Sequence, residues 1–249
     1  MTRTFTPRME ILSSVQQQLW PALRPAAGLG FVLYGGTAIA LRLGHRTSVD
    51  FDFFSENPLD RDAIRAAFPF VNASIVLQDQ PNTFTVNVPF DDNGGEYVKV
   101  SFFGTIAFGR VGTPDTTVDG VLQVASLDDL MATKVKIILQ RAEAKDYRDI
   151  AAMVCAGVDL SKGLGAARVL FGLNFQPSES LKAMVYFEDG DLRNLTAGEK
   201  AWLTKAASET RDLPTVQIVA HQLTALQRVP PNQPSSVRIS TRYDDGPRK

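Results

Sequence analysis

A six-residue segment, VDFDFF at residues 49–54, alternates apolar and acidic side chains with the two-residue period of a β-strand. In a strand, this period places Asp50 and Asp52 on one face. Phe51 and Phe53 then share the other face. When the phenylalanines are buried, the two carboxylates lie together in a partly dry setting, where they repel each other and resist ionisation. The segment therefore predicts a strand beside the core whose acidic face requires a cation.

Carboxylate oxygens favour magnesium, and manganese accepts the same ligands. Magnesium usually takes one or two protein carboxylates and completes its octahedron with water and substrate phosphates. Asp50 and Asp52 are therefore predicted to bind Mg²⁺ together with a phosphorylated substrate. A D-x-D pair is often only a solvated strand edge, but the flanking Val49 and Phe54 argue against that interpretation.

A glycine pair precedes the acidic segment. The apolar run at residues 31–33 ends at Gly35 and Gly36, and the following TAIALRL has helical character up to Gly44. A backbone without side chains can approach a phosphate closely, and a helix that begins near Thr37 would direct free N–H groups and a positive dipole end at it. The pattern predicts a phosphate-binding turn next to the acidic strand, although a glycine pair alone often only turns the chain.

The remaining segments predict a sheet followed by helices. An amphipathic opening helix is expected from Thr6 and Pro7 to Pro21, and a second helix is expected after the capping residue Asp60. The runs SIVLQ, TFTVNV and YVKVSFF have strand composition and are expected to form antiparallel hairpins. From Ser126 onward, a capping residue, an acidic first turn and repeated apolar periodicity indicate helices.

We therefore expect an α+β fold with a mixed, twisted sheet, followed by a helical domain. The expected boundaries are residues 1–125 for the sheet domain and residues 126–226 for the helical domain. A flexible, proline-rich tail is expected at residues 227–249.

Composition limits the partners. The 249 residues include 26 Lys and Arg against 27 Asp and Glu, so bulk charge favours no polyanion, and we expect no DNA partner. No run of 18 apolar residues and no apolar leader occurs, which predicts a soluble cytoplasmic protein without a membrane partner. The lone Cys155 fits a reducing compartment and is expected to be a small buried residue.

With these motifs in hand, the sequence resembles the polymerase-beta-like nucleotidyltransferase superfamily. In that superfamily a glycine-glycine or glycine-serine turn comes shortly before a D-x-D or D-x-E strand. Gly35, Gly36, Asp50 and Asp52 match this signature. The resemblance implies a nucleoside triphosphate (NTP) substrate and a polymerase-beta-like fold for the sheet domain.

The fuller segment YGGTAIALRLGHRTSVDFDFF resembles the AbiEii/AbiGii toxin branch. A G-G-T-A-L-like start and an R-x-S before D-h-D-h-F, where h is an apolar residue, are typical of this branch. Arg46, Ser48 and Phe53 extend the match. The whole resemblance reaches from about residue 31 to residue 192.

A second block, LMATKVKIILQRAEAKDYRDI, resembles a helical segment of the same branch. Its matching residues are Lys134, Arg141, Lys145, Asp146 and Asp149. By spacing alone, the first two would lie on nearly one helix face, and the two aspartates would be neighbours at i, i+3. The block could equally be a solvated helix face with Lys145 and Asp149 as an i, i+4 ion pair.

The resemblance also implies roles for individual residues. Lys134 would neutralise the triphosphate, and Asp146 would orient that lysine or the acceptor. Arg46 would reach a phosphate, although solvation at the surface is an equal possibility. The residues expected to be catalytic are Asp50, Asp52, Lys134 and Asp146, and those expected to bind nucleotide are Gly35, Gly36, Thr37, Arg46 and Lys134.

One departure concerns the third acid that many polymerase-beta-like enzymes carry on a later strand. In this sequence, the corresponding segment YVKVSFF offers Lys99 and Ser101. Toxin-branch members can lack that acid, so the departure leaves activity possible. It leaves open whether one or two metal ions act, and it leaves the general base unassigned.

The resemblance predicts an Mg²⁺-dependent nucleotidyltransferase that acts as the toxin of a toxin-antitoxin or phage-defence pair. Its acceptor would be RNA, with the tRNA 3′ end as the first candidate, and a cognate antitoxin would be a partner. Two alternatives stay open. One is a small-molecule nucleotidyltransferase of the antibiotic-modifying kind, and the other is a non-catalytic nucleotide-binding module.

Overall fold

The computed structural model describes residues 3–90 and 95–225. Within them, the strands form one sheet in which β3 runs antiparallel to β2 and parallel to β6. The order across the sheet is β1 (Thr4–Phe5), β7 (Asp115–Thr117), β8 (Gln123–Val124), β2 (Val32–Tyr34), β3 (Asp50–Phe54), β6 (Tyr97–Phe103), β5 (Thr83–Pro89) and β4 (Ile75–Gln80). The mixed sheet of an α+β fold is confirmed, and β4, β5 and β6 form the predicted hairpins.

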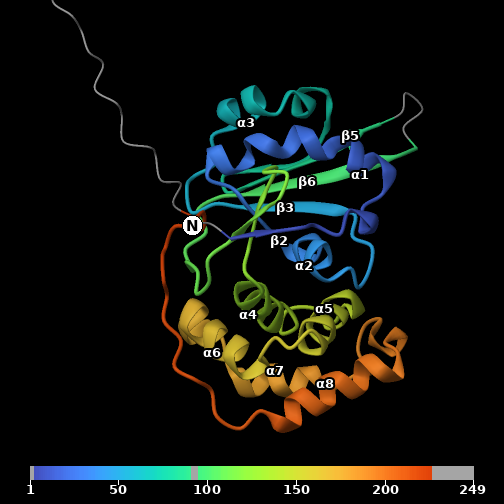
Figure 1. Cartoon of the computed structure of the whole chain (residues 1–249), viewed down its shortest axis with the longest axis vertical. Helices are drawn as coiled ribbons and strands as arrows, with labels where there is room; N and C mark the ends of the chain where they lie inside the picture. Colours follow the sequence, from blue (N-terminus) through green and yellow to red (C-terminus); the bar gives the residue numbers. More distant parts are fainter. Residues whose placement is uncertain (1–2, 91–94, 226–249) are drawn as a thin grey trace, which may run out of the picture.

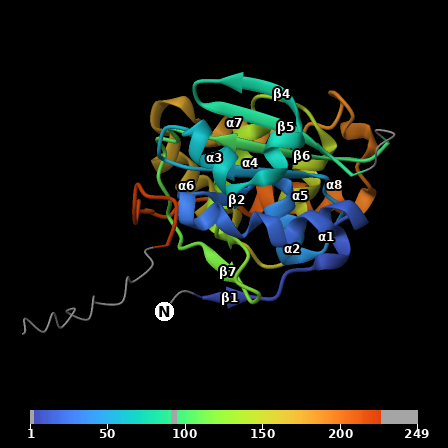
Figure 2. The ribbon, with the colours of Figure 1, turned by 90° about the horizontal axis from the view of Figure 1, so that it is seen from above.

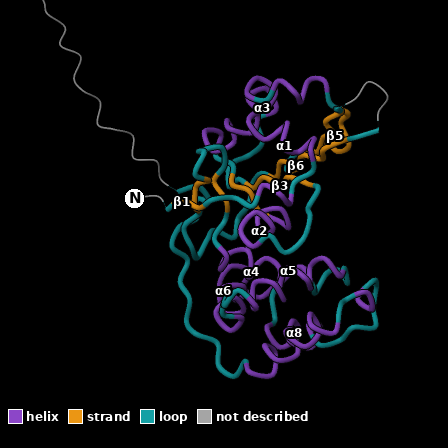
Figure 3. Tube along the Cα trace, turned by 45° about the vertical axis from the view of Figure 1, so that its right-hand side comes forward, coloured by secondary structure: helices purple, strands orange, loops and turns teal. Residues whose placement is uncertain are grey.

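Helices cover both faces of this sheet (Figure 1). On one face lie α1 (Ser14–Leu19), η2 (Trp20–Leu29), α3 (Arg61–Ala67) and η3 (Pro69–Ala73), with η1 (Met9–Ile11) preceding α1. On the other face lies α2 (Gly35–Leu43), followed by α4 (Leu127–Ile137), α5 (Ala144–Cys155), α6 (Leu160–Phe171), η4 (Gly172–Asn174), α7 (Pro177–Met184), η5 (Leu192–Asn194) and α8 (Ala197–Glu209). Figure 3 shows the strands as a band between the two sets of helices, and Figure 2 shows β1 and β4 at opposite edges.

Local sequence signals explain where several helices begin and end. The Asp60 side chain accepts a hydrogen bond from the amide of Ala63 and caps α3. Ser126 caps α4 in the same way, by accepting from the amide of Asp129. Gly44 closes α2 in the left-handed conformation, with φ of +68°. These predicted helix ends are confirmed.

The predicted opening helix is wrong in its extent. The residues after Pro7 form only a short 3₁₀ turn, and α1 begins at Ser14. Ser13 and Gln16 satisfy each other's backbone amides in a capping box, so the free amides of the helix start are satisfied there and not at the threonine-proline pair. Beyond α1 the chain continues as a 3₁₀ helix that contains Pro21.

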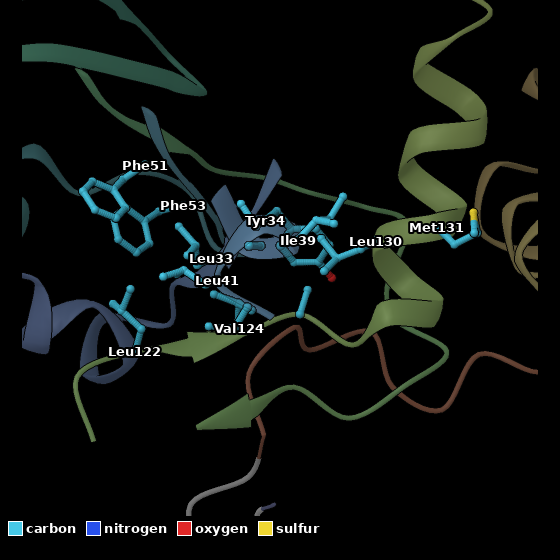
Figure 4. Packing of buried hydrophobic residues seen from close by; sticks show 14 of the residues in the cluster. Leu33, Tyr34, Ile39, Leu41, Phe51, Phe53, Leu122, Val124, Leu130 and Met131 are labelled. Atoms are coloured by element: carbon cyan, nitrogen blue, oxygen red, sulfur yellow. The ribbon is translucent and has the colours of Figure 1, made fainter. Parts of the chain in front are cut away.

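The alternation in β3 is confirmed. Phe51 and Phe53 are fully buried, whereas Asp50 and Asp52 stay partly accessible on the opposite face. The ring of Phe53 stacks on Phe102 of β6, with centroids 5.6 Å apart. Figure 4 shows Phe51 and Phe53 together in the core, on the far side of β2 from α4. Burial of the two rings therefore holds both aspartates on the face that α4 covers.

The change from strands to helices falls between Val124 and Leu127. We keep the division into two domains at residue 125 as a proposal, and the tail predicted at 227–249 lies outside the described residues. The prediction that Cys155 is buried is wrong. It is the last residue of α5 and is exposed, because the helix ends there and the chain turns away. None of the helices in the described residues is long and apolar enough to cross a lipid bilayer.

After α8 the chain returns to the sheet as an extended segment, residues 210–225 (Figure 1). Ala220 pairs with Arg110 in an isolated β-bridge. The buried guanidinium of Arg110 donates to the carbonyls of Gly112 and Gln222, at 2.7 and 2.9 Å. The amide of Leu223 donates to the Glu56 carboxylate. The helical region is therefore attached to the sheet at both of its ends.

The phenylalanine stack provides a test of the fold. Replacing Phe53 with Ala should lower the free energy of unfolding by about 3–5 kcal/mol, because it leaves a cavity in the core. Urea denaturation followed by circular dichroism measures the change. The control Leu173→Ala, at a side chain that is 97% exposed, should shift stability by less than about 0.5 kcal/mol. Equal effects of the two substitutions would contradict this account of the core.

Candidate active site

A pocket of about 640 Å³ lies between the sheet and α4. Its floor is the face of β3 that carries Asp50 and Asp52, continued by Lys99 and Ser101 of β6. Most of the residues predicted to form the site meet in its walls: Gly35, Gly36, Thr37, Arg46, Asp50, Asp52 and Lys134. Asp146, the remaining predicted residue, is fully buried and lies outside these walls.

The glycine turn needs both of its glycines. Gly35 begins α2 with φ of +75°, and a Cβ atom there would lie 2.8 Å from Asp52 Oδ2. A Cβ atom at Gly36 would collide with the guanidinium of Arg46. A side chain at either position would therefore push away a residue of the pocket. The first free amides of α2 and the positive end of its dipole are consequently held next to the aspartate pair.

Thr37 ties this turn to the acidic strand. Its hydroxyl is 2.7 Å from Ser48 Oγ and donates to the backbone carbonyl of Asp50. The residue is almost completely buried, so its hydroxyl serves this internal contact. The threonine predicted to bind nucleotide therefore positions the turn against β3.

The two aspartates differ in their surroundings. Asp50 forms an ion pair with Lys99, whose Nζ is 2.8 Å from Asp50 Oδ2. Asp52 is deeper and accepts a hydrogen bond from Ser101. Burial, and then the neighbouring charge of Asp50, raise the pKa of Asp52 above its ordinary value, although Lys99, Ser101 and Lys134 oppose the shift. A cation at the pair would favour the ionised form of both groups.

Lys134 of α4 is held by two aspartates of α5. Its Nζ is 2.6 Å from Asp146 Oδ1 and 2.7 Å from Asp149 Oδ2, and its side chain is 4% exposed. An ammonium group has three donors, so two are used and one remains for the pocket. Asp146 also accepts from Arg141 Nε at 2.8 Å. Its position behind Lys134 fits the predicted role of orienting that lysine, and it does not reach the pocket.

Asp149 joins the two sides of the pocket. Its carboxylate lies 2.7 Å from His45 Nε2 and accepts from Arg46 Nε and Nη2 at 2.7 and 2.9 Å, in addition to binding Lys134. Burial alone would raise the pKa of Asp149, but the His45 hydrogen bond and the charges of Lys134 and Arg46 hold it well below its usual range. Arg46, which was expected either at a phosphate or in solvent, thus lines the pocket while paired with Asp149.

The sequence patterns did not predict some features of the site. The i, i+4 pair considered for Lys145 and Asp149 does not form, because Lys145 Nζ binds Glu143 at 2.7 Å. The central role of Asp149 was not predicted, although its place in the KDYRD block was a signal. Further residues of the walls come from β4, β5, β6, α4 and the turn after α4, and no local motif marks them: Leu77, Gln78, Thr85, Phe103, Thr133 and Gln140.

Comparison with known proteins identifies the family. A family model described as the nucleotidyl transferase AbiEii toxin of type IV toxin-antitoxin systems matches residues 19–220. The chain belongs to this family. It is accordingly a nucleotidyltransferase of the toxin type, as the sequence predicted, and the family implies an NTP substrate and a cognate antitoxin.

Two individual proteins are similar to this AbiEii family member. An uncharacterized protein of Aquifex aeolicus is 30% identical over 175 residues, which cover 68% of this chain and 81% of that protein. The solved structure of MenT4, a nucleotidyltransferase toxin from Mycobacterium tuberculosis, aligns over 80% of this chain and 92% of that chain. Its TM-score is 0.46 and its sequence identity is 14%.

The substitution Asp149→Asn tests how much the buried, ionised carboxylate of Asp149 contributes to the stability of this AbiEii family member. Losing one partner of a buried ion pair should lower the free energy of unfolding by about 3–5 kcal/mol at pH 7. Because the pKa of Asp149 is lower in the folded state, its contribution is complete above the ordinary aspartate pKa and is lost as pH falls below it. Wild-type protein should therefore lose more stability than the variant between about pH 5 and 3.

Urea denaturation at a series of pH values measures both effects. The matched control is Asp62→Asn, at an exposed aspartate of α3, which should leave stability and its pH dependence nearly unchanged. Parallel stability curves for wild type and Asp149→Asn below pH 5 would contradict the assigned charge state.

Proposed function

We propose that the pocket binds an NTP and transfers its nucleoside monophosphate to an acceptor hydroxyl, with RNA, and tRNA in particular, as the acceptor. The observation that carries this proposal is the convergence of three elements on one pocket: the Gly35–Gly36 turn, the Asp50–Asp52 pair and Lys134. Each element matches one need of phosphoryl transfer: a phosphate cradle, a metal-binding carboxylate pair and a cation against developing charge.

The donor set at Asp50 and Asp52 fits Mg²⁺. Two carboxylates on one strand face provide oxygen ligands only, and magnesium obtains its other ligands from water and substrate phosphates. Among residues 3–90 and 95–225 no group of three or more Asp, Glu, His or Cys side chains could hold a metal ion, so the pair would act without a third acid. Mn²⁺ accepts the same ligands. When bound, such an ion would neutralise charge on the phosphates.

The remaining roles follow from position. The first amides of α2 would donate to phosphate oxygens, because the glycines leave the backbone accessible. Lys134 would direct its remaining N–H donor at the same phosphates. Its ion pairs with Asp146 and Asp149 would hold the ammonium group in position for this contact. Asp146 would act through Lys134 as a positioning residue.

In the proposed reaction, the acceptor oxygen forms a bond to the α-phosphorus and the bond from that phosphorus to the pyrophosphate oxygen breaks. Pyrophosphate leaves with the bonding electrons, and the hydroxyl proton passes to a base that the described residues do not single out. In-line displacement of this kind depends mainly on positioning and on electrostatic stabilisation, which the pocket residues supply.

The rim of the pocket favours an anionic acceptor. Arg141 and Lys145 line it, with side chains that are 45% and 51% exposed. Accessible cations beside an active pocket attract a phosphate backbone without reading its sequence. This local charge supports RNA more than an uncharged small molecule. NTP and RNA substrates would place the protein in the cytoplasm.

The aspartate pair gives the sharpest test of catalysis. Asp50→Asn and Asp52→Asn should each lower the rate of pyrophosphate release by at least about a hundredfold, because each removes charge from the metal-binding pair. Both variants should keep the wild-type circular dichroism spectrum, since the two side chains lie outside the core. The control Asp62→Asn should retain full activity, and an unchanged rate in either pocket variant would contradict the proposal.

The acceptor is tested by incubating the protein with Mg²⁺, each α-labelled NTP in turn and total RNA, and then resolving the labelled products. Labelled RNA, with tRNA as the main band, is the expected result. Transfer of the label to a small molecule in an RNA-free reaction would contradict RNA as the acceptor and would favour a small-molecule nucleotidyltransferase of the antibiotic-modifying kind. NTP binding by calorimetry without pyrophosphate release under any acceptor would indicate a non-catalytic module.

A further inference from the structure

Strand β6 brings an unusual pair of side chains to the proposed metal site. β6 runs parallel to β3, with Lys99 paired with Asp50 and Ser101 paired with Asp52 in the register. Paired residues of neighbouring strands point to the same face, so both side chains of β6 enter the pocket beside the aspartates. The strand next to the carboxylate pair therefore presents an ammonium and a hydroxyl, and no third carboxylate.

The ammonium is in direct contact with the pair. Lys99 Nζ is 2.8 Å from Asp50 Oδ2, which is hydrogen-bonding distance. An ion held by Asp50 and Asp52 would therefore lie beside the ammonium of Lys99. With two negative groups and one positive group, the three side chains carry a net charge of −1, which one divalent ion converts to +1.

A second divalent ion would be poorly accommodated. Two-metal sites hold their ions roughly 3.5–4 Å apart. A second ion next to Asp50 would compete with the Lys99 ammonium for the same carboxylate and would be repelled by it. In the described part of the chain no group of three or more Asp, Glu, His or Cys side chains could hold a metal ion and so offset this repulsion.

Lys99 also differs from the other lysine of the pocket wall that touches an aspartate. Lys134 is almost fully buried and is held by Asp146 and Asp149, which lie outside the metal-binding pair. The Lys99 side chain is 40% exposed, and its contact is with a proposed metal ligand. Its ammonium can therefore remain beside Asp50 while substrate and solvent reach the pocket.

From this geometry we infer that the ammonium of Lys99 occupies the place of a second divalent cation, so that Asp50 and Asp52 hold a single ion. The inference rests on the proposed function, because it concerns the same site. In this inference, the positive charge of Lys99 stabilises the transferred phosphate, a role that a second metal ion would otherwise fill. A lysine at this position makes the third carboxylate unnecessary.

The test counts bound ions in the full-length protein. Mn²⁺ is titrated in the presence of saturating α,β-methylene-ATP, or the corresponding analogue of whichever NTP binds. Electron paramagnetic resonance measures free and bound Mn²⁺, and calorimetry measures the affinity. Wild type should bind one Mn²⁺ per protein–nucleotide complex, with no spectral sign of coupling between two ions.

Two substitutions of Lys99 test whether this residue determines the number of bound Mn²⁺ ions. Lys99→Asp supplies a third carboxylate and should bind two Mn²⁺ ions, with a coupled spectrum. Lys99→Met removes the charge without adding an oxygen ligand and should bind one ion more tightly than wild type, since Asp50 loses its competing partner. The control Lys182→Gln, at an exposed lysine of α7 outside the pocket, should leave number and affinity unchanged.

The outcomes separate this inference from the proposed function. Two Mn²⁺ ions in the wild-type complex, or a single ion in a folded Lys99→Asp variant, would overturn the role of Lys99 and leave the nucleotidyltransferase proposal standing. No bound nucleotide and no bound Mn²⁺ in wild type would overturn the proposed function itself. Circular dichroism of each variant confirms that it is folded, and a wild-type count of two ions would overturn the inference even if a variant failed to fold.

Discussion

The geometry of the pocket depends on a buried carboxylate that binds cations from two separate parts of the fold. Asp149 of α5 is fully buried and contacts His45 and Arg46, which follow α2, as well as Lys134 of α4. A buried charge of this kind is tolerated only when it is paired and hydrogen-bonded. The arrangement therefore fixes the wall that carries Lys134 relative to the glycine turn on the opposite side.

The local parts of the site could be predicted because short-range sequence determines them. The alternation in residues 49–54 places side chains on strand faces without reference to the rest of the fold, and Gly35 and Gly36 identify a turn by their lack of side chains. The strand, the turn and the start of α4 at Ser126 accordingly match the structure.

Contacts between distant segments could not be predicted in this way. Arg46 and Asp149 are 103 residues apart, and their ion pair exists only because α2 packs against α5. The sequence could place Arg46 at a phosphate or in solvent, but a bidentate pair with a buried aspartate needs the tertiary structure. The predicted extent of the first helix was wrong for a local reason. The capping box of Ser13 and Gln16 sets the helix start, in place of the threonine-proline pair upstream.

The segment that returns from α8 to Arg110 has a mechanical consequence. A lid joined to a protein by one linker can swing in any direction and can even dissociate from its seat. Here the polypeptide crosses from the sheet to the helices once near residue 125 and crosses back through residues 210–225, where the backbone of Arg110 pairs with Ala220. The helical region is thereby joined to the sheet at two separate places, and the two attachments together restrict how far it can move relative to the sheet.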